Sequence, residues 1–120
     1  MLFGLSVRRL YRSALWLLAT VALLGSSTNA FAAETVGGNG HGLGLSLAIG
    51  AGDSELLAYF DTGSNDLLFS EKIAGSWSTA TVDSATTQPG ATALVYQNGV
   101  PHIFYTDIGA GTLRHAYRNG

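Results

Sequence analysis

Apolar residues after position 43 come in short runs that are separated by clusters of Gly, Asp, Asn and Ser. Some runs alternate apolar and polar positions, as GLSLAI does at 44–49, and the runs are rich in residue types that favour strands. No window keeps the i, i+3, i+4, i+7 spacing of a helix over a useful length. The pattern predicts an all-β chain of antiparallel strands, at 44–49, 55–60, 67–71, 76–82, 91–96, 102–106 and 112–118.

The chain matches itself when it is shifted by 46 residues, without a gap from Thr35 onward. The clearest unit is Tyr-x-Asp-x-Gly with Leu four positions later, at 59–67 and again at 105–113. We expect two repeats, 44–88 and 89–120, after an export segment at 1–32 and a glycine-rich entry at 33–43. A period of 46 residues with about four strands is the size of one β-propeller blade. The second repeat would be incomplete, since its counterpart of the Trp77 strand is missing from the sequence.

Three stretches carry a resemblance to a known family. GSWSTATVDS, NGVPHIFYTD and GTLRHAYRNG, within residues 75–120, resemble the blade repeats of secreted bacterial β-propeller proteins. The two Asp-x-Gly turns also resemble degenerate Asp-boxes of sialidase-like propellers, but they lack the preceding Ser or Thr and the closing Trp. The resemblance implies a β-propeller-like arrangement of one full blade and most of a second, with blades that pack face to face.

The first residues have the pattern of a secretory signal peptide. Arg8, Arg9 and Arg12 precede an apolar run at 14–25, and Ala30-Phe31-Ala32 fits the small-x-small cleavage rule. The alternative is an uncleaved membrane anchor, but the run is shorter than the roughly 20 residues that span a bilayer. We expect cleavage near Ala32 and a secreted, periplasmic or cell-surface protein.

Charge and cysteine content narrow the possible partners and the sources of stability. After Ala32 there are three basic and eight acidic residues, a net charge of −5. This disfavours nucleic acid, whose binding proteins carry basic stripes, and anionic membrane surfaces. A domain this small is marginally stable and has no cysteine for a disulfide, so more chain, further subunits or a metal must stabilise it.

The two Asp-x-Gly turns are expected to be structural. Asp61 and Asp107 follow strands and can accept hydrogen bonds from backbone N–H groups two residues on. Gly63 and Gly109 can adopt positive φ without steric cost. The alternative is a calcium loop at 61–66, but an EF-type loop needs more oxygen ligands and a later Glu. We expect turns here and no metal.

Aromatic and histidine side chains are the candidates for ligand binding. They are Tyr59, Trp77, His102, Tyr105, Arg114, His115 and Tyr117. One interpretation is packing between sheets, because large aromatics contribute much buried area and His102 and His115 replace apolar residues of the first repeat. The other is a sugar platform flanked by Arg114 and Tyr117. Zinc would need a third or fourth ligand besides the two histidines.

Catalysis is not expected from this chain. It has no Cys and no G-x-S-x-G, and with two arginines after Ala32 it lacks a sialidase-type site. The glycine-rich segment 37–52 lacks the Lys-Ser/Thr of a phosphate loop. The sequence predicts no cofactor and a lectin-like extracellular binding module; the alternatives are a structural or protein-interaction segment of a larger surface protein, or part of a sialidase-like glycoside hydrolase.

Two assemblies could satisfy an incomplete repeat array, because such arrays bury their cores only by stacking neighbours. The chain could be a fragment of a longer propeller. Alternatively, several copies could form a homo-oligomeric ring in which Thr35-Val36 of one copy completes the second repeat of its neighbour.

Overall fold

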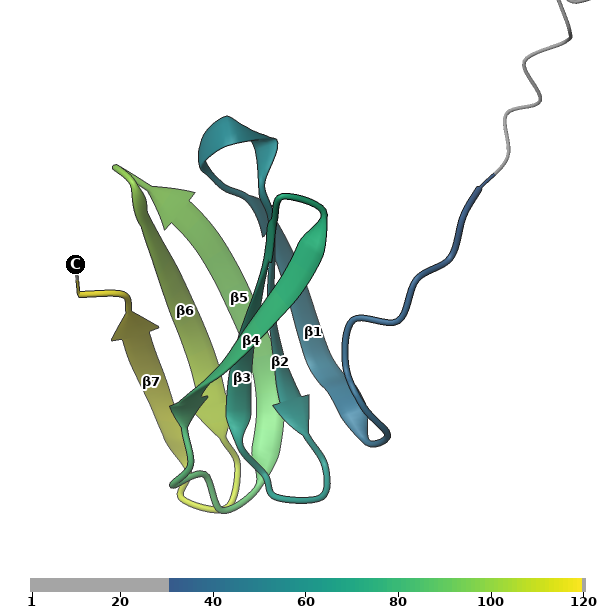
Figure 1. Cartoon of the computed structure of the whole chain (residues 1–120). Coiled ribbons are helices and arrows are strands. Elements are labelled where there is room, and N and C mark those ends of the chain that lie inside the picture. The colour runs from purple at the N-terminus through teal and green to yellow at the C-terminus, as the bar shows by residue number, and fades with distance from the viewer. Residues whose placement is uncertain (1–30, 120) are drawn as a thin grey trace, which may run out of the picture. The chain divides into compact units, whose positions relative to one another are not determined.

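The computed structural model describes residues 31–119, and its seven strands belong to one compact unit, Glu34–Gly120 (Figure 1). The strands are β1 (His41–Ile49), β2 (Glu55–Asp61), β3 (Leu67–Ile73), β4 (Ser76–Asp83), β5 (Pro89–Gln97), β6 (Val100–Asp107) and β7 (Thr112–Tyr117). A single 3-10 turn, η1 (Ala51–Asp53), joins β1 to β2. The predicted all-β class is therefore confirmed, and each predicted strand is found within three residues of its expected ends. The predicted export segment lies almost entirely outside the described residues.

The strands form two antiparallel sheets. Sheet 1 has the order β1-β2-β3-β4 and sheet 2 has the order β5-β6-β7. Each sheet is a simple meander, since every strand pairs with the strand that follows it in sequence. The boundary between the two sheets falls in the turn after Asp83, near the predicted boundary between the two repeats.

The register of the second and third strands repeats with the predicted interval. Tyr59 faces Leu68 across β2 and β3, and Tyr105 faces Arg114 across β6 and β7, 46 residues later on both strands. Residues 46 positions apart on these strands therefore project from corresponding faces of their two sheets. The repeat seen in the sequence is a repeat of strand pairing.

The first strand of the repeat departs from this interval by one residue. Leu47 faces Leu57, but Leu94 rather than Ala93 faces Ile103. The cause lies in the turns. Residues 50–54, with η1, join β1 to β2, whereas Asn98-Gly99 join β5 to β6 as a two-residue turn with positive φ at both positions, as type I′ hairpins require.

The core lies between the facing sides of the two sheets. It contains Leu56, Ala58, Phe60, Leu67 and Phe69 of sheet 1 and Ile103 and Tyr105 of sheet 2, with Leu94, Tyr96 and Ala116 packed against them. We call these the inner faces, and the opposite sides the outer faces. Alternation along each strand places neighbouring residues on opposite faces.

The closest approach of the two sheets is between β1 and β5. A Cβ on Gly44 would lie 2.5 Å from the carbonyl oxygen of Gly90, so only glycine permits this contact. Beside it, Ser46 Oγ and Thr92 Oγ1 share a hydrogen bond of 2.7 Å. Gly44 and Gly90 are equivalent in the two repeats, which means that the repeats meet through matching positions.

Candidate functional site

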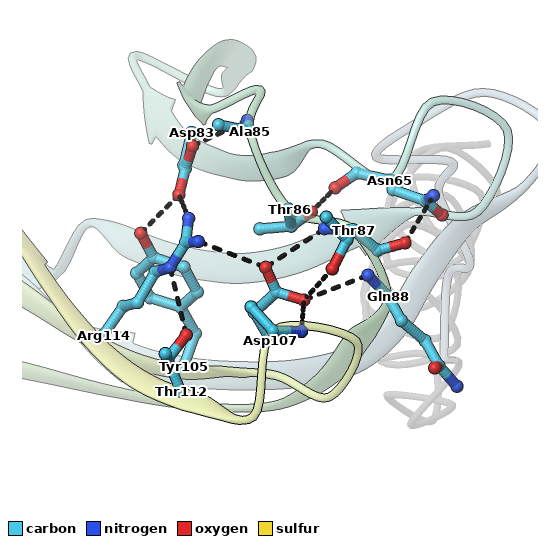
Figure 2. Close-up of polar contacts among 11 residues, drawn as sticks. Asn65, Asp83, Ala85, Thr86, Thr87, Gln88, Tyr105, Asp107, Thr112 and Arg114 are labelled. Carbon is cyan, nitrogen blue, oxygen red and sulfur yellow. Dashed lines mark hydrogen bonds and ion pairs between the residues drawn. The ribbon is translucent and has the colours of Figure 1, made fainter.

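The predicted binding residues lie in three places rather than in one site. Tyr59 and Trp77 lie on the outer face of sheet 1, on β2 and β4. Tyr105 and Arg114 lie on the inner face of sheet 2, where they join a polar cluster with Asp83 and Asp107 that we call the polar corner (Figure 2). His102, His115 and Tyr117 lie on the outer face of sheet 2. Each place offers different chemistry.

Asp107 is the centre of the polar corner, at the end of β6, and is fully buried. Its carboxylate accepts hydrogen bonds from the Thr87 N–H (3.1 Å), the Thr87 hydroxyl (2.8 Å), the Gln88 N–H (3.1 Å) and the Ala110 N–H (3.3 Å). Arg114 Nη2 lies 3.2 Å from Oδ2. Burial opposes the charge, but the donors of Thr87, Gln88 and Ala110 outweigh it and hold the pKa of Asp107 well below its usual range.

Asp83 brings the end of β4 into the same cluster. The Tyr105 hydroxyl donates to its Oδ2 at 2.6 Å, the Ala85 N–H donates to Oδ1 at 2.8 Å, and Arg114 Nη1 lies 2.9 Å from Oδ2. The Tyr105 hydrogen bond lowers the pKa of Asp83, with further help from Ala85 and Arg114. Burial, followed by the neighbouring carboxylate of Asp83, raises the pKa of Tyr105 to about 12.

The polar corner joins three segments of the chain: the end of β4 with the residues that follow it, the end of β6, and the start of β7 (Figure 2). Its charged side chains all have hydrogen-bond or ion-pair partners. Both carboxylates share one guanidinium, and the hydroxyl of Tyr105 is used by Asp83. Thr86 adds a hydrogen bond from its hydroxyl to the Asn65 carbonyl oxygen, which ties the linker between the two sheets, residues 84–88, to the β2–β3 turn. The arrangement joins sheet 1 to sheet 2, and its donors and acceptors are satisfied within the chain.

Asp61, the counterpart of Asp107, has fewer partners. Its Oδ1 accepts a hydrogen bond from the Gly63 N–H at 2.8 Å, and this bond is the main cause that lowers the pKa of Asp61. His41 Nε2 lies 3.4 Å from Oδ2. The carboxylate is partly exposed, and no equivalent of Arg114 is present, because the matching position on β3 is Leu68.

The expectation of positive φ at Gly63 and Gly109 is wrong. The left-handed residues of the two turns are Asn65 (φ 63°) and Gly111 (φ 64°), which are again 46 residues apart. Gly109 is needed for another reason, because a Cβ there would lie 2.4 Å from Thr87 Oγ1. Its small size lets the β6–β7 turn approach the linker between the sheets.

The outer face of sheet 1 is partly covered by the entry segment. The Tyr59 hydroxyl shares a hydrogen bond of 2.8 Å with Ser70 Oγ, and the ring centroids of Tyr59 and His41 are 5.7 Å apart. An apolar groove beside Tyr59 is lined by the entry residues Thr35 and Val36 and by strand residues such as Leu57.

Trp77 lies farther along the same outer face. Lys72 Nζ lies 5.5 Å from the centre of its ring, and this ammonium pairs with Glu34. The hydrogen bond from Lys72 is the main cause that lowers the pKa of Glu34. The Trp77 indole N–H is buried and has no hydrogen-bond partner among the described residues. Lys72 thus links the entry segment to sheet 1.

Four rings lie together on the outer face of sheet 2. We call His102, Phe104, His115 and Tyr117 the aromatic platform. His102 Nδ1 lies 3.1 Å from His115 Nε2, and the rings of Phe104 and His115 stack with centroids 4.3 Å apart and planes 8° apart. Phe104 is 43% exposed and Tyr117 is 56% exposed. Phe104 is a member that the sequence reasoning missed.

A cavity of about 160 Å³ opens between the sheets near β4 and β7. Its walls are mainly apolar and include Phe69, Val82 and Ile103. Arg118 closes one side, where its guanidinium lies 4.9 Å from the centre of the Phe69 ring and 3.0 Å from Glu71. The cavity therefore suits an apolar group better than a hydroxyl-rich one.

Sequence reasoning also missed the partners that complete the polar corner. Asp83 lies in the GSWSTATVDS stretch that carries the family resemblance, and Thr87 and Gln88 lie in the linker between the sheets. A usable signal was the scarcity of cations, since Arg114 is one of three after Ala32 and needs carboxylate partners when it lies on an inner face.

Comparison with known proteins finds no matching family model, no similar curated protein and no similar solved structure. Across residues 31–119, His, Asp and Glu side chains do not gather in groups of three or more that could hold a metal ion. The same residues include no helix with the length and apolar character needed to cross a membrane.

Proposed function

We propose that Glu34–Gly120 is a non-catalytic extracellular binding module of β-propeller-like repeats, exported by a cleaved signal peptide, and that it binds through the aromatic platform. The observation that carries the proposal is the exposure of Phe104 and Tyr117 beside two stacked histidines, on a sheet face that no other element within residues 31–119 covers. Contiguous apolar surface of this kind is rare on monomeric proteins unless it serves an interaction.

A protein partner is better supported than a glycan. Val95 and Leu113, both largely exposed, flank the platform, and its own residues include no Asp, Glu, Lys or Arg. The carboxylates and guanidinium that could hold sugar hydroxyls belong to the polar corner, on the other face of sheet 2, where they bind one another. Aromatic and aliphatic surface with few charges is the composition of the core of a protein interface.

A lectin-like activity is the second candidate. It is favoured by the nearly parallel Phe104 and His115 rings and by the exposed ring of Tyr117, since flat aromatic surfaces can pack against the apolar face of a sugar. The remaining polar groups of the platform are one phenol and two imidazoles.

The experiment presents the full chain, expressed for export and purified as produced, to a glycan array and to a displayed library of random peptides. We expect peptides that bind the wild type and lose at least about tenfold in affinity with Phe104→Ser. Ile108→Ser, at an exposed apolar residue outside the platform, is the control and should bind normally. A glycan bound through Tyr117 would establish the lectin activity, and absence of both kinds of ligand would refute the proposal.

A further inference from the structure

The contact between the two sheets shows which two faces of the repeat fit together. The inner face of sheet 1 buries Ala58, Phe60 and Phe69 against Ile103 and Tyr105 of sheet 2. Because Tyr59 and Tyr105 hold equivalent positions, the inner face of sheet 2 corresponds to the outer face of sheet 1. The two sheets are thus stacked in the same orientation, not as mirror partners.

The outer face of sheet 1 keeps the apolar character of its buried counterpart. Leu57 and Tyr59 lie where Ile103 and Tyr105 lie in sheet 2, and with the one-residue shift of the first strand Leu47 and Ile49 lie where Leu94 and Tyr96 lie. Tyr59 is only 3% exposed beside the entry segment, whereas Leu47 is 59% exposed and Ile49 is 54% exposed. This face has the residues of an interface without a sheet to cover it among the described residues.

The outer face of sheet 2 is the matching half. Phe104, Leu113 and His115 lie where Ala58, Leu67 and Phe69 lie in sheet 1. Leu113 is 73% exposed. The aromatic platform and the outer face of sheet 1 are therefore the two sides of the internal contact, present once more on opposite sides of the same molecule.

The entry segment extends this correspondence. Thr35-Val36 match Thr81-Val82 at the end of β4, and Lys72 matches Arg118. Val36 lines a groove with Leu57 of sheet 1, as its counterpart Val82 lines a cavity with Ile103 of sheet 2. Lys72 pairs with Glu34 of the entry segment, whereas Arg118 pairs with Glu71, which is not the counterpart of Glu34. The entry segment therefore lies on sheet 1 as the end of β4 lies near sheet 2.

We infer that the partner of the aromatic platform is a second copy of this chain, bound head to tail. The outer face of sheet 1 and the entry segment of one copy dock on the platform and the β7 edge of the next. This inference rests on the proposed function of the platform and names its partner. The contact is heterologous, so one copy can bind a neighbour on each side.

The internal pairing sets the register of the contact. Ala80 faces Phe69 across β4 and β3, and the same shift of 46 residues places Glu34 of one copy opposite His115 of the next. The entry segment then adds to the free edge of β7 as β4 adds to β3, which is strand addition between molecules.

Complementation of two variants tests the head-to-tail geometry. Leu47→Ser alters only the outer face of sheet 1 and Phe104→Ser alters only the platform, and both sites are exposed enough to spare the fold. In sedimentation, we expect each variant to weaken self-association by at least about tenfold. An equal mixture should form a heterodimer, because one interface then has two intact halves. Ile108→Ser should associate like the wild type.

Engineered cysteines test the register, since the chain has no natural cysteine. A mixture of Glu34→Cys and His115→Cys chains should form a mixed disulfide dimer on mild oxidation. Leu113→Cys in place of His115→Cys moves the thiol two residues along β7 and should lower the yield at least about fivefold, because disulfides require Cα atoms within about 7 Å.

The outcomes separate this inference from the proposed function. A wild-type chain that stays monomeric while Phe104-dependent peptides bind the platform refutes the head-to-tail contact and leaves the function standing. Association that is not restored by mixing the two variants also refutes it, because an isologous dimer cannot be complemented in this way. A monomer whose platform binds nothing refutes both.

Discussion

Tyr59 with Asp61 and Tyr105 with Asp107 are two copies of one motif in unequal surroundings. Each pair ends the second strand of its sheet and precedes the same kind of turn. Asp107 is fully buried and receives donors from three residues and a guanidinium, whereas Asp61 is partly exposed and binds one backbone N–H and a histidine. The local motif thus determines the turn, and the neighbouring sheet determines how much the turn contributes to stability.

Acid should remove the extra stability that the buried carboxylates give the second turn, and this is the largest effect on the melting temperature that we expect. The pKa values of Asp83 and Asp107 are lowered in the folded chain, so their contribution is complete above the ordinary value near 3.8 and is lost as the pH falls below it. We expect a constant melting temperature from pH 7 to about pH 5 and a steep fall below about pH 4, followed by circular dichroism. An unchanged melting temperature at pH 2 would contradict the ionic role of the polar corner.

Substitution of the two aspartates should show, at neutral pH, how much each copy of the motif contributes to stability. Asp107→Asn places an amide NH₂ among the N–H donors of Thr87 and Gln88, so we expect the melting temperature to fall by about 10 °C. Asp61→Asn, the matched control, should change it by about 2 °C or less. Equal losses in the two variants would show that sheet stacking does not distinguish the turns.

The strands and the repeat could be predicted because both are local properties of the chain. Runs of β-forming residues between turn formers indicate strands, and Tyr-x-Asp-x-Gly indicates a repeated pairing that Tyr59–Leu68 and Tyr105–Arg114 confirm. The shift of β5 by one residue could not be predicted from an ungapped match, since it depends on how 50–54 and Asn98-Gly99 turn.

The division of the candidate residues among three places could not be predicted either. Alternation along a strand places Phe104 and Tyr105 on opposite faces, but it does not say which face meets the other sheet. Stacking in the same orientation buries Tyr105 and exposes Phe104, whereas in sheet 1 it buries Ala58 in the core and leaves Tyr59 on the outer face. Equivalent residues therefore acquire different roles through tertiary contact.

The glycines of the two turns provide a smaller contrast. Gly109→Ala forces a Cβ to within 2.4 Å of Thr87 Oγ1 and disturbs the bond from Thr87 to Asp107, so we expect a loss of about 2 kcal/mol in the free energy of unfolding. Gly63→Ala brings its Cβ only to 3.3 Å from Asp61 Oδ1 and should cost less than about 0.5 kcal/mol. Urea unfolding measures both, and a neutral Gly109→Ala would mean that the linker yields at Thr87.

The two tyrosine variants should differ least in their loss of unfolding free energy, and this difference should depend on pH. Tyr105→Phe removes a 2.6 Å hydrogen bond to a carboxylate and should cost about 2 kcal/mol, whereas Tyr59→Phe removes a neutral hydrogen bond to Ser70 and should cost about 1 kcal/mol. The pKa of Tyr105 is raised from 10.0 to about 12, so the bond contributes fully below pH 10 and is lost as the pH rises through 12. The gap in unfolding free energy between the wild type and Tyr105→Phe should therefore narrow over this range. A gap that stayed constant up to pH 12 would mean that the hydroxyl stabilises the corner by packing and not as a donor to Asp83.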